Sequence, residues 1–211
     1  MGAIKEKLVA AALAEWEFFK RSTRSIDDVW KIGGDEAQAP YTSHISRYWA
    51  AVGLPDWTGK TDQPWSAAFV SWCFEAAGAQ GKFPPNATHS AYIDAIRRHA
   101  GASADLVLKS PTEAIVEVGD LIWNPRKKKP PTEYVPPANF NEAIQRLKAG
   151  QYFDSHVDIV VEVTANSCSS IGGNVSNLDI GGSVTRSTWR VADGKLSDPR
   201  KQWIGIVKNG L

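Results

Sequence analysis

The chain has 211 residues, enough for one domain with a sizeable core, and its 24 Lys and Arg against 23 Asp and Glu give a net charge of +1. This balance excludes bulk electrostatic binding to nucleic acid or to an anionic membrane. Two cysteines are too few for a disulfide framework or a cysteine-built zinc site, and no stretch reaches the ~20 apolar residues of a membrane span.

Predicted helices fill the first half of the chain. Residues 3–21 carry apolar side chains at helical spacing, and Glu6 and Lys7 precede too short an apolar run for a secretion signal. Further helices are predicted at residues 25–34, 40–55, 64–77 and 90–99. Nine tryptophans are expected to serve mainly in the core, with a groove for sugar or peptide as the alternative.

Beyond residue 105, short segments rich in β-branched and aromatic residues alternate with turn-forming residues, which predicts strands. The predicted strands are residues 105–110, 120–125, 156–163, 167–174, 183–191 and 203–209. A helical half packed on a mostly antiparallel sheet is an α+β fold. We expect residues 1–58 to form a helical extension packed on a domain of residues 59–211.

An insertion at about residues 126–152 interrupts the predicted strands. Its first part is proline-rich and contains the basic triplet at 127–129, which we expect to be a solvated loop rather than a site for an anionic polymer. Its second part predicts a short helix with Asn139 or Asn141 as the N-cap and Gly150 at its end.

Three segments together have the components of nucleophilic catalysis. Ser66 begins a predicted helix, where free N–H groups and the helix dipole stabilise negative charge. His156 and Asp158 lie two residues apart on one predicted strand, so their side chains share a face. Asn174 follows two glycines at the end of the next strand. A hydroxyl, an imidazole and a polar group that orients it are the parts of a serine hydrolase, although each residue alone also fits a structural role as cap, strand-edge or turn residue.

Four segments follow one another in an order that resembles the papain-like cell-wall hydrolase superfamily, over about residues 60–210: PWSAAFVSWCFEAAG, VGDLIW, SHVDIVVEV and IGGNVSN. That superfamily includes the NlpC and CHAP amidases, with a Trp-Cys-Ala-X-Phe-Val helix start, a Gly-Asp-Leu strand, a His-Val strand and a following strand with an Asn. The chain is most similar to an uncharacterised bacterial branch, a domain of unknown function. That branch has Trp-Ser-Ala-Ala-Phe, a His-X-Asp strand and a His-X-X-Tyr motif, here His89 to Tyr92. The resemblance implies a papain-like fold and cleavage of amide bonds in peptidoglycan peptides.

The resemblance also implies roles for individual residues. Ser66 takes the position of the nucleophilic cysteine, and His156 that of the general base. Asn174, or alternatively Asp158, would orient the imidazole, and Gly119-Asp120 matches the structural Gly-Asp of the first core strand. A serine hydroxyl is far more basic than a thiol, so Ser66 must lose its proton to the imidazole during attack.

The remaining candidate residues are expected to support this site. His89, Tyr92 and Trp65 are expected to contact the substrate, with capping of the following helix as the alternative for His89. Cys73, about two turns after the serine, is expected to be a buried structural residue, and its pairing with Cys168 stays open. The sequence predicts no cofactor and no metal, because the histidines and aspartates lack a short ligand motif such as His-X-X-X-His.

The leading hypothesis is a peptidoglycan hydrolase, an amidase or endopeptidase with a Ser-His-Asp/Asn site. The alternatives are a catalytically disabled papain-like fold that binds the cell wall, and a structural component of a phage or secretion particle. Without a signal peptide, the protein is expected to be made in the cytoplasm of a bacterium or phage-infected cell and to reach the periplasm through a dedicated system or lysis. This setting fits an antibacterial effector or a phage lysis protein, with peptidoglycan as one partner and an immunity or secretion protein as another.

Overall fold

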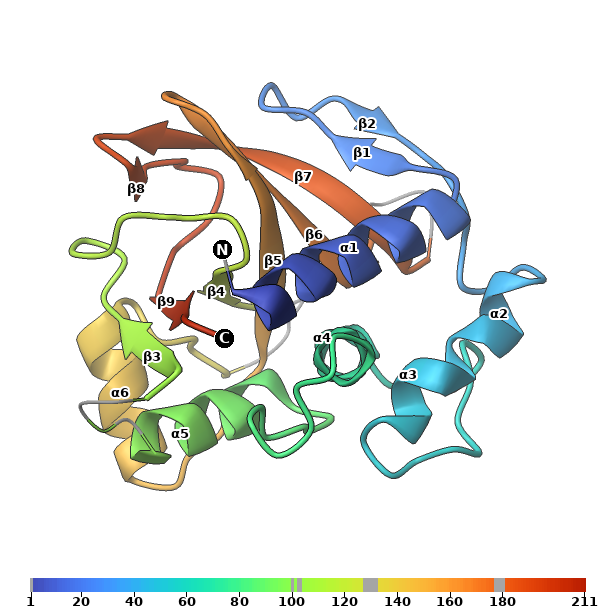
Figure 1. The fold of residues 1–211 in the computed structure, drawn as a ribbon, viewed down its shortest axis with the longest axis horizontal. Coiled ribbons are helices and arrows are strands. Elements are labelled where there is room, and N and C mark those ends of the chain that lie inside the picture. Colours follow the sequence, from blue (N-terminus) through green and yellow to red (C-terminus); the bar gives the residue numbers. More distant parts are fainter. Residues whose placement is uncertain (1, 100, 102–103, 127–132, 177–180) are drawn as a thin grey trace.

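The computed structural model describes residues 2–99, 101, 104–126, 133–176 and 181–211 and shows a mixed α+β fold (Figure 1). Within these residues the helices are α1 (Ala3–Phe18), α2 (Tyr41–His44), α3 (Ser46–Ala50), α4 (Ser66–Ala76), α5 (His89–His99) and α6 (Phe140–Lys148). The strands are β1 (Ser22–Arg24), β2 (Trp30–Lys31), β3 (Leu106–Lys109), β4 (Leu121–Pro125), β5 (Ser155–Val163), β6 (Ser167–Val175), β7 (Ser183–Ala192), β8 (Lys195–Leu196) and β9 (Gly205–Asn209). The basic triplet at 127–129 lies outside the described residues.

The described strands form one large sheet in the order β2-β1-β7-β6-β5-β4-β9-β3, with β8 paired to β7. Strands β3 to β9 pair with one another in antiparallel fashion, and β1 pairs with β7 in parallel. The predicted mostly antiparallel sheet is therefore confirmed. Residues 1–58 contribute β1 and β2 to this sheet as well as helices α1 to α3.

The helix predicted at 25–34 is wrong, because this segment forms the turn and second strand of a hairpin with β1. Ser25 does not cap a helix. Its Oγ accepts the N–H groups of Asp27 and Val29, which closes a turn, and Asp28 takes a left-handed backbone conformation with φ 65°. The pairing of β1 with β7 fixes the hairpin on the sheet, a contact that local sequence does not encode.

The other predicted helices are present. The single helix predicted at 40–55 is divided into α2 and α3 by Ile45, and Asn139 is the N-cap of α6, its side chain accepting the N–H of Glu142. Strand β8 was not predicted, because its two residues follow a tight turn and carry little β-forming character.

The two faces of the sheet carry different parts of the core. Helices α1 and α4 cover one face (Figure 1), where Val157 and Ile159 of β5 belong to the main apolar cluster. Because side chains alternate along a strand, His156 and Asp158 point to the other face, where Val160 packs in a second cluster with Trp189. The candidate imidazole and carboxylate thus lie on the side of the sheet away from α1 and α4.

A buried carboxylate joins α1 to the segment before α4. Glu15 accepts a hydrogen bond from the Tyr48 hydroxyl and lies 2.6 Å from Nε2 of His44. The ring of Tyr48 stacks on Trp65 with 5.5 Å between centroids. These contacts fix the residue that immediately precedes α4 and so set the position of the helix start.

Both cysteines are buried and free, and they belong to different apolar clusters. Cys73 lies in mid-helix α4, and burial raises the pKa of its thiol well above the usual value. Burial also raises the pKa of Cys168 to about 12. Neither thiol is a thiolate at neutral pH, so the expectation of a structural Cys73 is confirmed.

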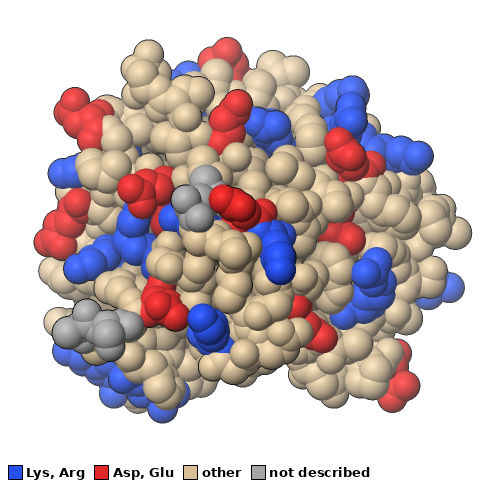
Figure 2. Space-filling view, viewed as in Figure 1, with Lys and Arg blue, Asp and Glu red and all other residues tan. Residues whose placement is uncertain are grey.

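Lysine and arginine side chains are interspersed with acidic ones over the face shown in Figure 2. This mixture agrees with the near-neutral net charge of +1. Among the described residues, no helix combines the length and the hydropathy needed to cross a bilayer.

Candidate active site

Ser66 is the first residue of α4 and lies on a cavity of about 600 Å³. The lining of this cavity includes the aromatic residues Trp49 and Trp57 together with His89 and Arg126. Because α4 begins at Ser66, the unpaired N–H groups of its first turn and the positive end of its dipole lie beside the hydroxyl. This cavity, called here the Ser66 cavity, therefore combines a hydroxyl, an imidazole and a site that favours negative charge.

The partner of the Ser66 hydroxyl is His89, the first residue of α5. Its Nε2 lies 2.8 Å from Oγ of Ser66, and its Nδ1 lies 2.5 Å from the hydroxyl of Tyr92, one turn further along α5. A hydroxyl both donates and accepts, so Ser66 donates to Nε2 when Nδ1–H donates to Tyr92. In this tautomer His89 is positioned to take the proton of Ser66.

A second imidazole lies next to the first. The rings of His156 and His89 meet edge to face, with an interplanar angle of 73° and 5.6 Å between centroids. Nε2 of His156 lies 2.8 Å from Oδ1 of Asp158, although the ring does not direct its N–H along a hydrogen bond to that oxygen. Oδ2 of Asp158 accepts from Ser170 at 2.9 Å, and Ser170 Oγ in turn accepts from the indole N–H of Trp189 at 2.8 Å. The carboxylate is thus held from the side opposite the imidazole.

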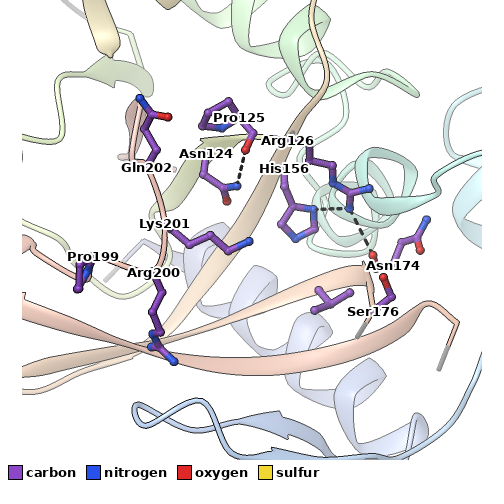
Figure 3. A pocket seen from close by; sticks show the side chains of 11 residues that line it. Asn124, Pro125, Arg126, His156, Asn174, Ser176, Pro199, Arg200, Lys201 and Gln202 are labelled. Atoms are coloured by element: carbon purple, nitrogen blue, oxygen red, sulfur yellow. Dashed lines mark hydrogen bonds between the residues drawn. The ribbon is translucent and has the colours of Figure 1, made fainter. Parts of the chain in front are cut away.

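Arg126 lies beside His156 (Figure 3) and lines both the Ser66 cavity and a second cavity. Its Nη2 donates to Nδ1 of His156 at 3.0 Å and to the carbonyl oxygen of Asn174 at 3.3 Å. A guanidinium only donates, so Nδ1 of His156 is the acceptor and the ring proton is on Nε2, the nitrogen that lies nearer to Asp158. Arg126 thereby sets the tautomer of His156.

Two glycines allow the site to form. A Cβ on Gly172 would lie 1.9 Å from Oδ1 of Asp158 and 2.8 Å from Nε2 of His156, so only glycine fits beside this pair. A Cβ on Gly173 would lie 2.6 Å from atoms of Phe69 and Trp65, on the opposite face. Consecutive glycines therefore admit the histidine–aspartate pair on one face of β6 and the start of α4 on the other.

Burial sets the protonation states of the site. It lowers the pKa of His89 well below the usual 6.5, and repulsion from the charges of His156 and Arg126 lowers this pKa further. The pKa of His156 is also lowered by burial, against the opposing effect of Asp158. For Asp158, burial would raise the pKa, but the contacts with His156 and Ser170 outweigh it and the pKa is lowered. At neutral pH both imidazoles are neutral bases beside an ionised carboxylate.

These shifts predict acid sensitivity of the fold. Below about pH 6.5 the histidines take up protons in the unfolded chain but not in the folded one. The unfolding free energy should therefore fall as pH decreases below that value, by up to about 1.4 kcal/mol per pH unit for each histidine. Urea denaturation across this range should show a shallower fall for His89→Gln. The same change at the exposed His99 should leave the slope unaltered, and equal slopes for wild type and His89→Gln would contradict the shift.

The structure brings the predicted residues together in two groups. Ser66 contacts His89, and His156 contacts Asp158, but no hydrogen bond joins Ser66 to His156 within the described residues. The side chain of Asn174 points away from the His156 ring (Figure 3), and its Oδ1 lies 2.3 Å from the position that a Cβ on Gly182 would take. Asp158, not Asn174, is therefore the group at the His156 ring.

Two predicted substrate-binding residues are corrected. Trp65 and Tyr92 are each 1% exposed, so neither offers a surface to a ligand. Trp65 packs in the core and donates its indole N–H to Glu36, and Tyr92 acts through His89. Among the described residues, no group of three or more His, Cys, Asp or Glu side chains is arranged to hold a metal ion.

The fold and site define an α+β protein with a serine–histidine pair at the start of a helix packed on a large sheet. The chain belongs to the bacterial family DUF2272, described as an uncharacterized protein conserved in bacteria, which matches residues 20–209. Comparison with curated proteins and with solved structures gives no match. The predicted relationship to a bacterial domain of unknown function is thereby confirmed.

Proposed function

We propose that the protein is a serine hydrolase that cleaves amide bonds in cell-wall peptides. The observation that carries this proposal is the 2.8 Å contact between Oγ of Ser66 and Nε2 of His89 at the start of α4, on an open cavity. A hydroxyl of this kind becomes a nucleophile only when a base removes its proton, and a neutral imidazole in hydrogen-bond contact is such a base.

The contacts suggest the order of steps. Oγ of Ser66 attacks the amide carbonyl as its proton moves to Nε2 of His89, and the N–H groups of the first turn of α4 stabilise the oxyanion. His89 then gives the proton to the leaving amine, and an acyl-enzyme remains. Water, deprotonated by the same imidazole, releases the acid and restores Ser66. Asp158 stays ionised beside His156 and holds that second ring in place against His89.

The arrangement of helix and sheet also supports a papain-like relationship, with the difference that the partner of Ser66 is His89 and not the strand imidazole of His156. A helix that starts at the nucleophile packs on a mostly antiparallel sheet, and an imidazole projects from the first residues of a central strand. A cell-wall peptide as substrate follows from that relationship. The Ser66 cavity, whose lining includes both aromatic rings and polar groups, suits a peptide.

Histidine variants separate the two imidazoles. Release of soluble fragments from purified peptidoglycan should fall by about 100-fold or more in His89→Gln, because the base is lost. The rate of His156→Gln should fall less, by about tenfold, because the ring of His156 packs against His89 and positions it but does not take the proton. His99→Gln is the control and should match wild type. An inactive His156→Gln beside a near-normal His89→Gln would assign the base to His156 instead.

A cell-wall-binding module is the second candidate, and the burial of the nucleophile favours it. Ser66 is 2% exposed and His89 4% exposed, and Arg126 occupies Nδ1 of His156. This function predicts that the protein sediments with peptidoglycan sacculi and releases no fragments, with Ser66→Ala behaving as wild type. Fragment release by the wild type, with none by Ser66→Ala, would exclude the binding module.

A further inference from the structure

A second cavity, of about 720 Å³, adjoins the Ser66 cavity at Arg126, which lines both. We call it the Lys201 cavity, after the side chain that extends into it (Figure 3). Its polar lining includes Asn124, His156, Asn174, Lys201 and Gln202. The proposed reaction requires nothing from most of these side chains.

Two cations face this cavity, and neither has a carboxylate partner at ion-pair distance among the described residues. Arg126 donates there to uncharged acceptors, the ring of His156 and a backbone carbonyl. Lys201 is partly buried, and within the described part of the chain its ammonium has neither a hydrogen-bond acceptor nor an ion-pair partner. Burial lowers the pKa of Lys201, and the attraction of Asp158 only partly offsets this. A partly buried ammonium without an acceptor is costly unless a ligand supplies one.

The third cation of the cavity wall is already satisfied. Arg200 is paired with Asp198 at 2.7 Å and donates to the carbonyl oxygens of Ser25 and Thr188. Its guanidinium turns away from the cavity in Figure 3. Asp158 attracts both cations, Asp154 also attracts Arg126, and Asp28 also attracts Lys201. The oxygens of Asp158 face His156 and Ser170. The net positive character of the cavity therefore comes from Arg126 and Lys201.

The geometry points to binding of a carboxylate of an acidic peptide between Arg126 and Lys201, which would place the neighbouring amide bond toward Ser66. This inference rests on the proposed function. A guanidinium and an ammonium complement one carboxylate, and the surrounding amide side chains offer both donors and acceptors to a peptide backbone. The volume is that of a pocket for a small ligand.

The experiment measures binding rather than turnover. The Ser66→Ala protein is titrated calorimetrically with a stem-peptide fragment that has a free α-carboxylate on its glutamyl residue. The same peptide with that carboxylate converted to an amide is the second probe, and inorganic phosphate is the third. Lys201→Met and Lys201→Arg are made in the same background, with Lys148→Met, an exposed lysine on α6, as the matched control. Thermal melting establishes that each variant is folded.

We expect the acidic peptide to bind at least about tenfold more tightly than its amide, because one charged hydrogen-bonding group is lost. Lys201→Met should remove this difference, Lys201→Arg should retain most of it, and Lys148→Met should retain all of it. Equal affinities for the two peptides, or an unchanged difference in folded Lys201→Met, would overturn the inference. Phosphate binding as tight as that of the acidic peptide would overturn the choice of a carboxylate. These titrations use Ser66→Ala, which is expected not to hydrolyse the peptide. A negative binding result would therefore overturn only the carboxylate site, and the proposed hydrolysis is tested separately by fragment release from the wild type.

Discussion

Ser66→Ala should reduce the release of soluble fragments from purified peptidoglycan by at least about 1000-fold relative to wild type. The reason is that the attacking oxygen is removed while the base and the cavity stay in place. The residues that remain in Ser66→Ala cannot supply the lost rate, because a nucleophile and its base act as a unit. Fragment release is followed by chromatography of the soluble products over the same time course.

The matched control for this variant is Ser71→Ala. Ser71 is also a buried serine of α4, and its hydroxyl bonds the carbonyl oxygens of Ala67 and Asn86 rather than an imidazole. The Ser71→Ala substitution should lower the free energy of unfolding modestly and leave the rate of fragment release near that of wild type. Equal release by Ser66→Ala and wild type would exclude Ser66 as the nucleophile.

Gly172→Ala should be the most damaging small substitution in the sheet. The added methyl group would lie 1.9 Å from Oδ1 of Asp158 and 2.8 Å from Nε2 of His156, far inside van der Waals contact. The strand must shift or the histidine–aspartate pair must separate, and we expect a loss of about 3 kcal/mol in unfolding free energy. Fragment release should fall as well, because His156 loses its carboxylate.

Urea denaturation measures this effect, with Gly101→Ala as the control. Among the described residues, no atom lies within 4 Å of the position that a methyl group would take on Gly101, so its substitution should change stability by less than about 0.5 kcal/mol. A Gly172→Ala protein as stable as Gly101→Ala would show that the pair is not packed against β6 as described.

Periodicity and end signals predicted most of the fold. Asn139, followed three residues later by Glu142, forms the expected cap, and alternation along β5 placed His156 and Asp158 on one face. The hairpin of β1 and β2 was missed, because its stability depends on β7, more than 150 residues away in the chain. Local sequence does not report pairing over that distance.

The components of the site were predicted better than their contacts. Ser66, His89, His156 and Asp158 all lie in one region, but sequence assigned Ser66 to His156, whereas its hydroxyl bonds His89. Which of two histidines reaches a hydroxyl depends on how α4 and α5 pack, and spacing alone does not determine that.

Other site residues gave weaker signals. Gly172, in the interior of a predicted strand, carries the general signal of a close approach. Arg126 begins the basic, proline-rich segment. The composition of that segment predicts a solvated loop, so Arg126 was not expected to belong to a site. Lys201 has no local pattern that distinguishes it from a surface lysine, and only the folded structure places it on a cavity beside Arg126.

The central claim is that Ser66 is a nucleophile activated by His89, and covalent labelling tests it most directly. The protein is incubated with a fluorophosphonate, which phosphonylates activated serines with loss of fluoride, then digested and mapped by mass spectrometry. We predict a single adduct on Ser66 in wild type, and strongly slowed labelling in His89→Gln but not in His99→Gln. Fragment-releasing protein that carries no adduct on Ser66, or labelling that is unchanged in His89→Gln, would contradict this assignment.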